Sequence, residues 1–111
     1  MKNRRLLYSA MLLSLTMGTL VATGARAAGD AEAGQVKAIP CMGCHAIPGY
    51  NNVYPTYHVP RVGGQHPEYI VAALKAYKAK QRSHPTMQAQ AASLSEGDMQ
   101  DIAAFFALKR E

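Results

Sequence analysis

The sequence predicts an all-α domain of three main helices joined by long loops. Two segments, residues 66–80 and 95–109, place apolar side chains at helical spacing, and Asp30 can cap a third helix near the start of the domain. Residues 46–64 are rich in glycine, proline and asparagine and show no sustained alternation of period two. No strand is therefore expected, and the loops must be held by something other than a sheet.

Residues 1–27 have the pattern of a secretory signal peptide. A positive start (Lys2, Arg4, Arg5) precedes an apolar run over 6–21, and Ala25-Arg26-Ala27 fits a small-x-small cleavage site. The run is shorter than the roughly 18 to 20 apolar residues that span a membrane comfortably, so a retained anchor is the weaker alternative. We expect cleavage after Ala27, a domain over residues 28–111, and export to the periplasm.

Removal of the signal peptide changes the charge of the chain. The full sequence has twelve Lys and Arg, seven Asp and Glu, and a formal net charge of +5, but residues 28–111 keep eight basic and seven acidic residues, a formal charge of +1. This near-neutral balance gives no reason to expect nucleic-acid binding.

The first helix is expected to run from Asp30 to about Ala38. Asp30 is a favourable N-cap, Glu32 complements the dipole in the first turn, and Pro40 is expected to stop the helix.

Cys41-Met42-Gly43-Cys44-His45 is the most informative stretch of the chain. Two thiols at this spacing can bond to the two vinyl groups of one haem while the adjacent imidazole takes the iron, as in covalently attached haem c. The chain has only these two cysteines, which excludes a four-cysteine zinc or iron–sulfur site. A disulfide, a thioredoxin-like redox pair and a zinc site sharing histidines remain as alternatives.

The second helix is expected from His66, with Pro67 at its first position, to about Lys80. Its predicted inward stripe is Ile70, Ala73, Leu74 and Tyr77. The basic cluster at its end consists of Lys75, Lys78, Lys80 and Arg82. This cluster is either a docking face for an acidic partner or a solvated helix face.

Met87 is the predicted second axial ligand of the iron. It lies 42 residues after His45 on a segment expected to be an extended loop, because Pro85 disfavours a helix through His84. A thioether ligand raises the reduction potential of haem iron. His84 is the rival ligand, while His58 and His66 are expected at the surface or in caps.

The last helix is expected from Ser95 to about Lys109. Ser95 and Asp98 resemble a capping box, and the predicted buried stripe is Met99, Ile102, Phe105 and Phe106. A domain of this size with no tryptophan and two phenylalanines buries little apolar surface, so we expect it to be largely unfolded without haem.

The ordered set of motifs resembles the class I cytochromes c, most closely the small monohaem periplasmic cytochromes of bacteria and single domains of their two-haem relatives. The similar stretches are Gly-Asp-Ala-Glu-Ala-Gly (29–34), Cys-Met-Gly-Cys-His (41–45), Pro-Arg-Val-Gly-Gly-Gln (60–65), His-Pro-Thr-Met (84–87) and Leu-Ser-Glu-Gly-Asp-Met-Gln-Asp-Ile-Ala-Ala-Phe-Phe (94–106). The chain departs from the family pattern at Ala46 and in the long 46–59 loop.

This resemblance implies a cytochrome c fold wrapped around one covalent haem. It implies that the first and last helices cross, with Gly34 giving Phe105 or Phe106 close approach. It also implies that the Pro60 carbonyl accepts a hydrogen bond from the His45 ring nitrogen that does not bind iron.

The function implied is that of a monomeric periplasmic one-electron carrier, not an enzyme, in a respiratory or dehydrogenase-linked chain. Expected donors are a quinol-oxidising complex or a dehydrogenase, and expected acceptors are a terminal oxidase or reductase, with membranes met only through these partners. A permanently bound haem subunit of such a complex is one alternative. A ligand-binding or peroxidatic haem protein with a labile Met87 is another.

Overall fold

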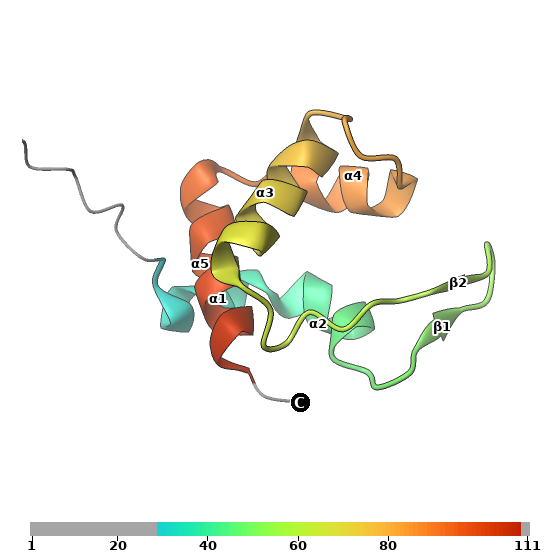
Figure 1. Ribbon diagram of the computed structural model, residues 1–111, viewed down its shortest axis with the longest axis horizontal. Helices are drawn as coiled ribbons and strands as arrows, with labels where there is room; N and C mark the ends of the chain where they lie inside the picture. Colours follow the sequence, from blue (N-terminus) through green and yellow to red (C-terminus); the bar gives the residue numbers. More distant parts are fainter. Residues whose placement is uncertain (1–28, 110–111) are drawn as a thin grey trace, which may run out of the picture.

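The computed structural model describes residues 29–109, which form helices and one short hairpin (Figure 1). The predicted signal peptide, residues 1–27, lies outside the described residues. No helix within 29–109 is long and apolar enough to cross a membrane. The elements, in chain order, are α1 (Ala31–Lys37), α2 (Ile39–His45), β1 (Asn51–Asn52), β2 (Tyr57–His58), α3 (Pro67–Lys78), α4 (Pro85–Ala92) and α5 (Glu96–Leu108).

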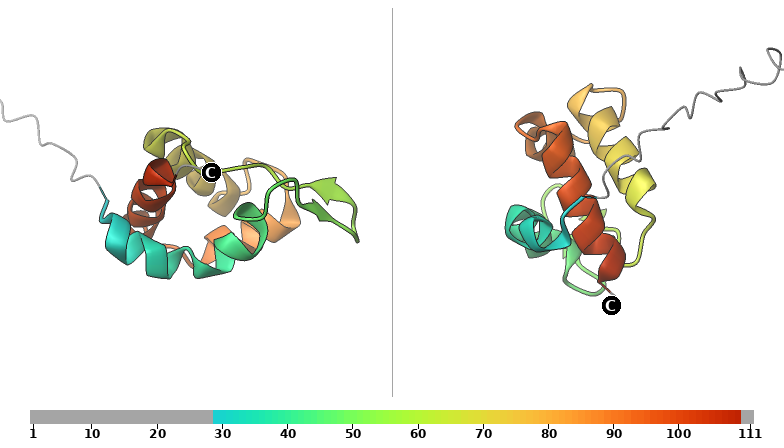
Figure 2. Two further views of the ribbon diagram at one scale, coloured as in Figure 1. Left: turned by 90° about the horizontal axis from the view of Figure 1, so that it is seen from below. Right: turned by 90° about the vertical axis from the view of Figure 1, so that its left-hand side faces the viewer.

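Helix α5 is the centre of the packing. Helices α1 and α3 both pack on it, and α4 packs on α3 (Figure 2). The most deeply buried large side chains, Met99, Ile102 and Phe106, all belong to α5, while Phe105 of the predicted stripe is only partly buried. The core is completed by Ala38, Ile70, Leu74, Ala91 and Ala103. The predicted stripes therefore supply most of the core: Ile70 and Leu74 of α3 are buried with Met99, Ile102 and Phe106 of α5, while Tyr77 is partly buried against them.

Helices α1 and α5 cross so closely that only glycine fits at the crossing. A Cβ atom on Gly34 would lie 1.9 Å from the carbonyl oxygen of Asp101 and 3.0 Å from the Cβ of Phe105. A Cβ on Gly29 would similarly lie 2.1 Å from the carbonyl oxygen of Gln100. The close approach implied at Gly34 is present, with the α5 backbone as the nearest neighbour and Phe105 next to it.

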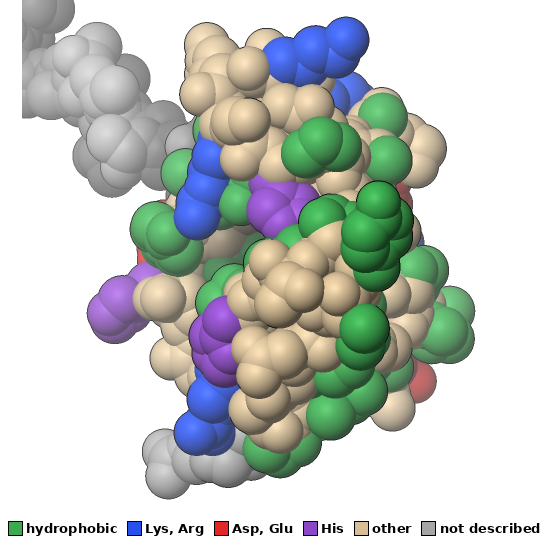
Figure 3. Space-filling model, turned by 90° about the vertical axis from the view of Figure 1, so that its right-hand side faces the viewer, with side chains coloured by type: hydrophobic (Ala, Val, Ile, Leu, Met, Phe, Trp, Pro, Cys, Tyr) green, Lys and Arg blue, Asp and Glu red, His purple; other side chains and the backbone are tan. Residues whose placement is uncertain are grey.

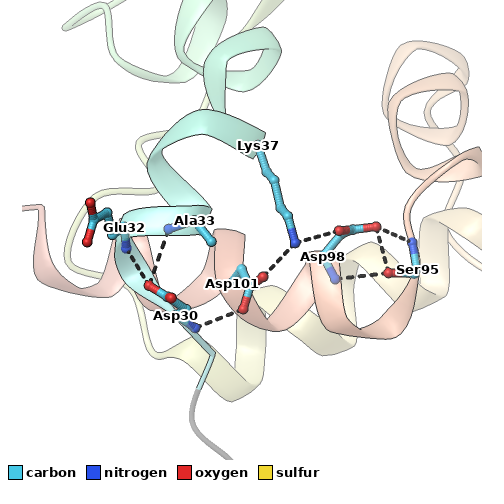
Figure 4. A network of polar contacts seen from close by, with 7 residues as sticks. All are labelled: Asp30, Glu32, Ala33, Lys37, Ser95, Asp98 and Asp101. Carbon is cyan, nitrogen blue, oxygen red and sulfur yellow. Dashed lines mark hydrogen bonds and ion pairs between the residues drawn. The ribbon is translucent and has the colours of Figure 1, made fainter.

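A network of polar contacts also joins α1 and its N-cap to α5 (Figure 4). Lys37 Nζ lies 2.7 Å from Asp98 Oδ1 and 2.6 Å from Asp101 Oδ2, and the Asp30 backbone N–H donates to Asp101 Oδ1 at 2.8 Å. Asp98 also completes the predicted capping box with Ser95. One lysine of α1 thus joins the two acidic residues that lie on the facing side of α5.

The charges in this network shift one another's titration. Hydrogen bonds from Lys37 and Ser95 hold the pKa of Asp98 well below its usual range, and Lys37 also lowers the pKa of Asp101. The same contacts, led by the hydrogen bond to Asp101, raise the pKa of Lys37 to about 12. All three groups favour their charged forms in the folded protein.

Three local features differ from what the sequence predicted. The first helix ends at Lys37, close to the expected end before Pro40, but a second helix that was not expected begins at Ile39 with Pro40 in its first turn. Residues 85–92 form helix α4, whereas Met87 was expected on an extended loop. The 46–64 region, expected to lack strands, contains the antiparallel pair Asn51–His58 and Asn52–Tyr57. Proline at a first turn keeps the φ angle helical and gives up an N–H that has no partner there, so it favours a start as readily as a stop.

Gly34→Ala is expected to destabilise the holoprotein by about 1–3 kcal/mol or more, because the added methyl group forces α1 away from the α5 backbone. Gly97→Ala is the matched control, since its Cβ would meet only Ser95 Oγ at 3.8 Å, and helix propensity should make it neutral or stabilising by up to about 1 kcal/mol. Denaturant titration of both variants measures the difference. Equal unfolding free energies would contradict the close crossing.

Lys37→Met is expected to flatten the acid dependence of stability. Carboxyl groups with lowered pKa values stabilise the fold above their ordinary pKa of 3.8, and this contribution is lost as the pH falls through the lowered values. The Lys37 contribution is complete below 10.5 and is lost as the pH rises through about 12. Unfolding free energies of the parent at pH 6, 4 and 3 should therefore decrease more steeply than those of Lys37→Met. Lys80→Met removes the same charge outside the network and should keep the parent's slope.

Candidate functional site

A cavity of about 520 Å³ lies between α2, α3, α4, α5 and the segment 57–65. Its wall includes all four residues of the α3 stripe, together with Ile102 and Phe106 of α5. The residues that bring reactive or metal-binding atoms to this wall are Cys41, Cys44, His45, His58, His84 and Met87. The predicted thiols, imidazole and thioether therefore all reach one mostly apolar chamber.

Helix α2 carries the cysteine motif. Cys41, Cys44 and His45 are three and four residues apart, which places them on one face of the helix, and all three are half-buried. Both thiols are free. Burial raises the pKa of the Cys41 thiol, and the neighbouring Cys44 adds to this effect. Cys41 thus lacks the lowered pKa that is typical of a reactive redox thiol.

The His45 ring is held by the loop that follows the hairpin. Its Nδ1 lies 2.8 Å from the Pro60 carbonyl oxygen, the contact that the resemblance implies. With Nδ1 donating to this carbonyl, Nε2 is the ring nitrogen available to a metal. The loop itself is fixed by a hydrogen bond from the Gly64 N–H to the Phe106 carbonyl at 2.9 Å, and Gly64 has a φ of +77°, which favours glycine.

Met87 enters the cavity from α4, where it is the third residue of the helix. Helix α4 contacts α3 and does not contact α2; in Figure 1, α2 lies low and α4 high. His45 and Met87 therefore reach the same cavity from two helices that it separates. His84, the rival ligand, also lines the cavity and is the N-cap of α4.

The tyrosines of the long loop have different surroundings. Tyr57 lines the cavity, whereas Tyr54 at the hairpin tip is 95% exposed and does not. Among the described residues that line the cavity, Lys37, Arg61 and Arg82 carry charge and none is acidic. Figure 3 shows this side of the molecule, with Lys, Arg and His across the face and acidic side chains only at its margins. Two of these basic residues have partners within the domain, since Lys37 pairs with Asp98 and Asp101 and Arg82 donates to the Tyr69 hydroxyl.

The basic cluster at the end of α3 is mostly engaged within the domain. Lys75 bonds Glu96, Lys78 donates to the Leu94 carbonyl, and Arg82 donates to the Tyr69 hydroxyl. His58 and His66 are exposed, as expected, and His66 is the N-cap residue of α3.

The alternatives for the cysteine motif lack support in this geometry. The two thiols form no disulfide, and the motif is preceded by α1 where a thioredoxin-like pair needs a strand. Across residues 29–109, no group of three or more His, Cys, Asp or Glu side chains is placed to hold a metal ion. A zinc site at the motif therefore lacks its remaining ligands.

Fold and site together define a small helical domain arranged to hold one covalently attached haem. The chain is 38% identical over 82 residues to cytochrome c-554(548) of Halomonas halodenitrificans, an alignment that covers 71% of this chain and 95% of that protein. It is 39% identical over 101 residues to cytochrome c4 of Pseudomonas aeruginosa, covering 90% of this chain and 48% of that protein. The chain belongs to the c-type cytochromes.

Other relatives show the same relation. Cytochrome c4 of Stutzerimonas stutzeri is 36% identical over 110 residues, covering 90% of this chain and 50% of that protein. The chain thus spans about half the length of the cytochrome c4 relatives it matches. No protein-family model matches the chain.

The residues present fit a haem c. Helix α2 has no buried residue, and α1 is the only described element whose backbone approaches it closely, although the Cys41 and Met42 side chains touch the edge of the core. The motif helix therefore lies across a mostly apolar chamber from α4, and the two helices do not contact each other. A flat apolar group bonded to both thiols would fill this space and support α2.

The double variant Cys41→Ala, Cys44→Ala is expected to be largely unfolded, because it loses the group that would pack between α2 and α4. Circular dichroism with thermal melting tests this against the parent holoprotein. A native-like spectrum with a cooperative melt would show that the polypeptide forms its own core.

Proposed function

We propose that this chain is a periplasmic one-electron carrier of a respiratory or dehydrogenase-linked chain, with His45 and Met87 as the axial ligands. The observation that carries the proposal is that both thiols, the His45 imidazole and the Met87 thioether line the same mostly apolar cavity. A bound haem c supplies one-electron cycling between ferrous and ferric iron. The protein transfers electrons and is not an enzyme.

The chain's own residues have separable tasks. Cys41 and Cys44 hold the cofactor covalently, and the Pro60 carbonyl orients His45 by accepting from Nδ1. Met87 would hold the iron with its thioether and so would leave no site for oxygen, peroxide or carbon monoxide. The apolar wall around these groups excludes water and limits rearrangement on electron transfer.

The proposed partners are redox proteins: a quinol-oxidising complex or dehydrogenase as donor, and a terminal oxidase or reductase as acceptor. Contacts with them are expected to be small and transient, and the carrier is expected to be monomeric.

Met87→Ala is expected to remove the iron–thioether charge-transfer band and to lower the reduction potential, because the thioether stabilises ferrous iron. Optical spectra of the purified holoprotein in both redox states, with a potentiometric titration, measure both effects. Met42→Leu is the control, because Met42 lies inside the motif but does not line the cavity, and it should keep the band. Absence of the band from the parent would overturn the ligand assignment.

Two further results would redirect the proposal. Rapid carbon monoxide binding to the reduced parent at neutral pH would favour a ligand-binding or peroxidatic haem protein. Comigration of the whole native pool with a large enzyme in size-exclusion chromatography would favour a permanent subunit. A free pool at the monomer's size, with slow carbon monoxide binding, supports the carrier.

A further inference from the structure

The sequence His84-Pro85-Thr86-Met87 builds the N-terminus of α4. His84 is extended, with φ −172° and ψ 102°, as the residue before a proline prefers, and Pro85 occupies the first helical position. Met87 is then the third helical residue, whose backbone N–H an N-cap side chain reaches. The Met87 N–H does donate to His84 Nδ1, at 3.4 Å.

The His84 ring is held by side chains from two other elements. Tyr57 of β2 meets it edge to face, with ring centroids 4.8 Å apart and planes at 83°, and Tyr77 of α3 does so at 6.5 Å and 77°. The Tyr57 hydroxyl also lies 3.5 Å from Thr86 Oγ1 in the first turn of α4. The imidazole is therefore the point at which hairpin, α3 and α4 meet.

The turn between α3 and α4 is closed by Arg82. Its guanidinium lies 4.8 Å from the centre of the Tyr77 ring and donates to the Tyr69 hydroxyl at 3.3 Å. Its carbonyl accepts from Gln88 Nε2 at 2.9 Å. These contacts fix the chain on both sides of His84.

We propose that His84 is a positioning residue which, braced by Tyr57 of the hairpin, fixes the first turn of α4 so that the Met87 thioether is presented to the cavity. This inference rests on the proposed function, in which Met87 is an axial ligand. His84, the alternative ligand, then has a different task. Its Nδ1 accepts the hydrogen bond from the backbone N–H of Met87, the proposed ligand. The bracing by Tyr57 also gives the 46–59 segment a part in holding that ligand.

The test is the replacement of the thioether by added imidazole in the ferric holoprotein, followed as loss of the charge-transfer band. His84→Ala removes the cap and should accelerate replacement roughly five- to tenfold, as expected from the cost of losing an N-cap. His84→Asn restores a side-chain acceptor at the cap and should return the rate to within about threefold of the parent. Global unfolding free energies, measured in parallel, separate this effect from general destabilisation.

Two tyrosines of the hairpin test whether Tyr57 braces His84. Tyr57→Leu should accelerate replacement in the same direction as His84→Ala, because it removes the ring that braces the imidazole. Tyr54→Leu, in the same hairpin but 95% exposed, should leave the rate unchanged.

Each remaining outcome has one meaning. An unchanged rate in His84→Ala, or no recovery in His84→Asn, would overturn the positioning task while Met87 stays the ligand. Equal effects of Tyr57→Leu and Tyr54→Leu would overturn the part of the hairpin. A parent without the charge-transfer band would instead refute the proposed ligand set, and such a parent whose spectrum is changed by both His84 variants and left unchanged by Met87→Ala would have His84 as the ligand.

Discussion

The space between α2 and α4 is the constraint on which the rest of the structure depends. Each helix is supported on one side only, α2 by α1 and α4 by α3, and the two bound an apolar chamber without meeting. An empty chamber of this size would leave its walls without dispersion contacts, at a cost that a domain with few large side chains cannot offset. The cysteine motif can fill this chamber covalently, because Cys41 and Cys44 of α2 line it and a group bonded to them would lie inside it.

The crossing of α1 and α5 is held by contacts of a different kind. It combines backbone contact at Gly34 with the Lys37, Asp98 and Asp101 network. These contacts use neither thiol nor imidazole. The molecule thus has one region, the α1–α5 crossing, whose contacts lie within the polypeptide, and a second region, the chamber, whose walls need a bound group to be packed.

Much of this arrangement could be predicted from the sequence, because its signals are local. The capping box at Ser95 and the stripe of α3 depend on spacing alone, and both are present as expected. The errors concern proline. Pro40 and Pro85 were interpreted as breaks, but each lies in the first turn of a new helix, and this pattern at Pro85 would also have revealed His84 as a cap. The hairpin was not predictable, since two-residue strands leave no periodicity to detect.

The hydrogen bond from the Asp30 N–H to the Asp101 carboxylate also affects the order in which parts of the chain can fold. These residues are 71 positions apart, so their hydrogen bond cannot form until nearly the whole domain has emerged, from a ribosome or from a translocation channel. Cys41 and Cys44, near the beginning of the domain, emerge long before that moment. Both thiols therefore become accessible before α1 and α5 can close on each other, so a haem could be bonded to them while the chain is still open.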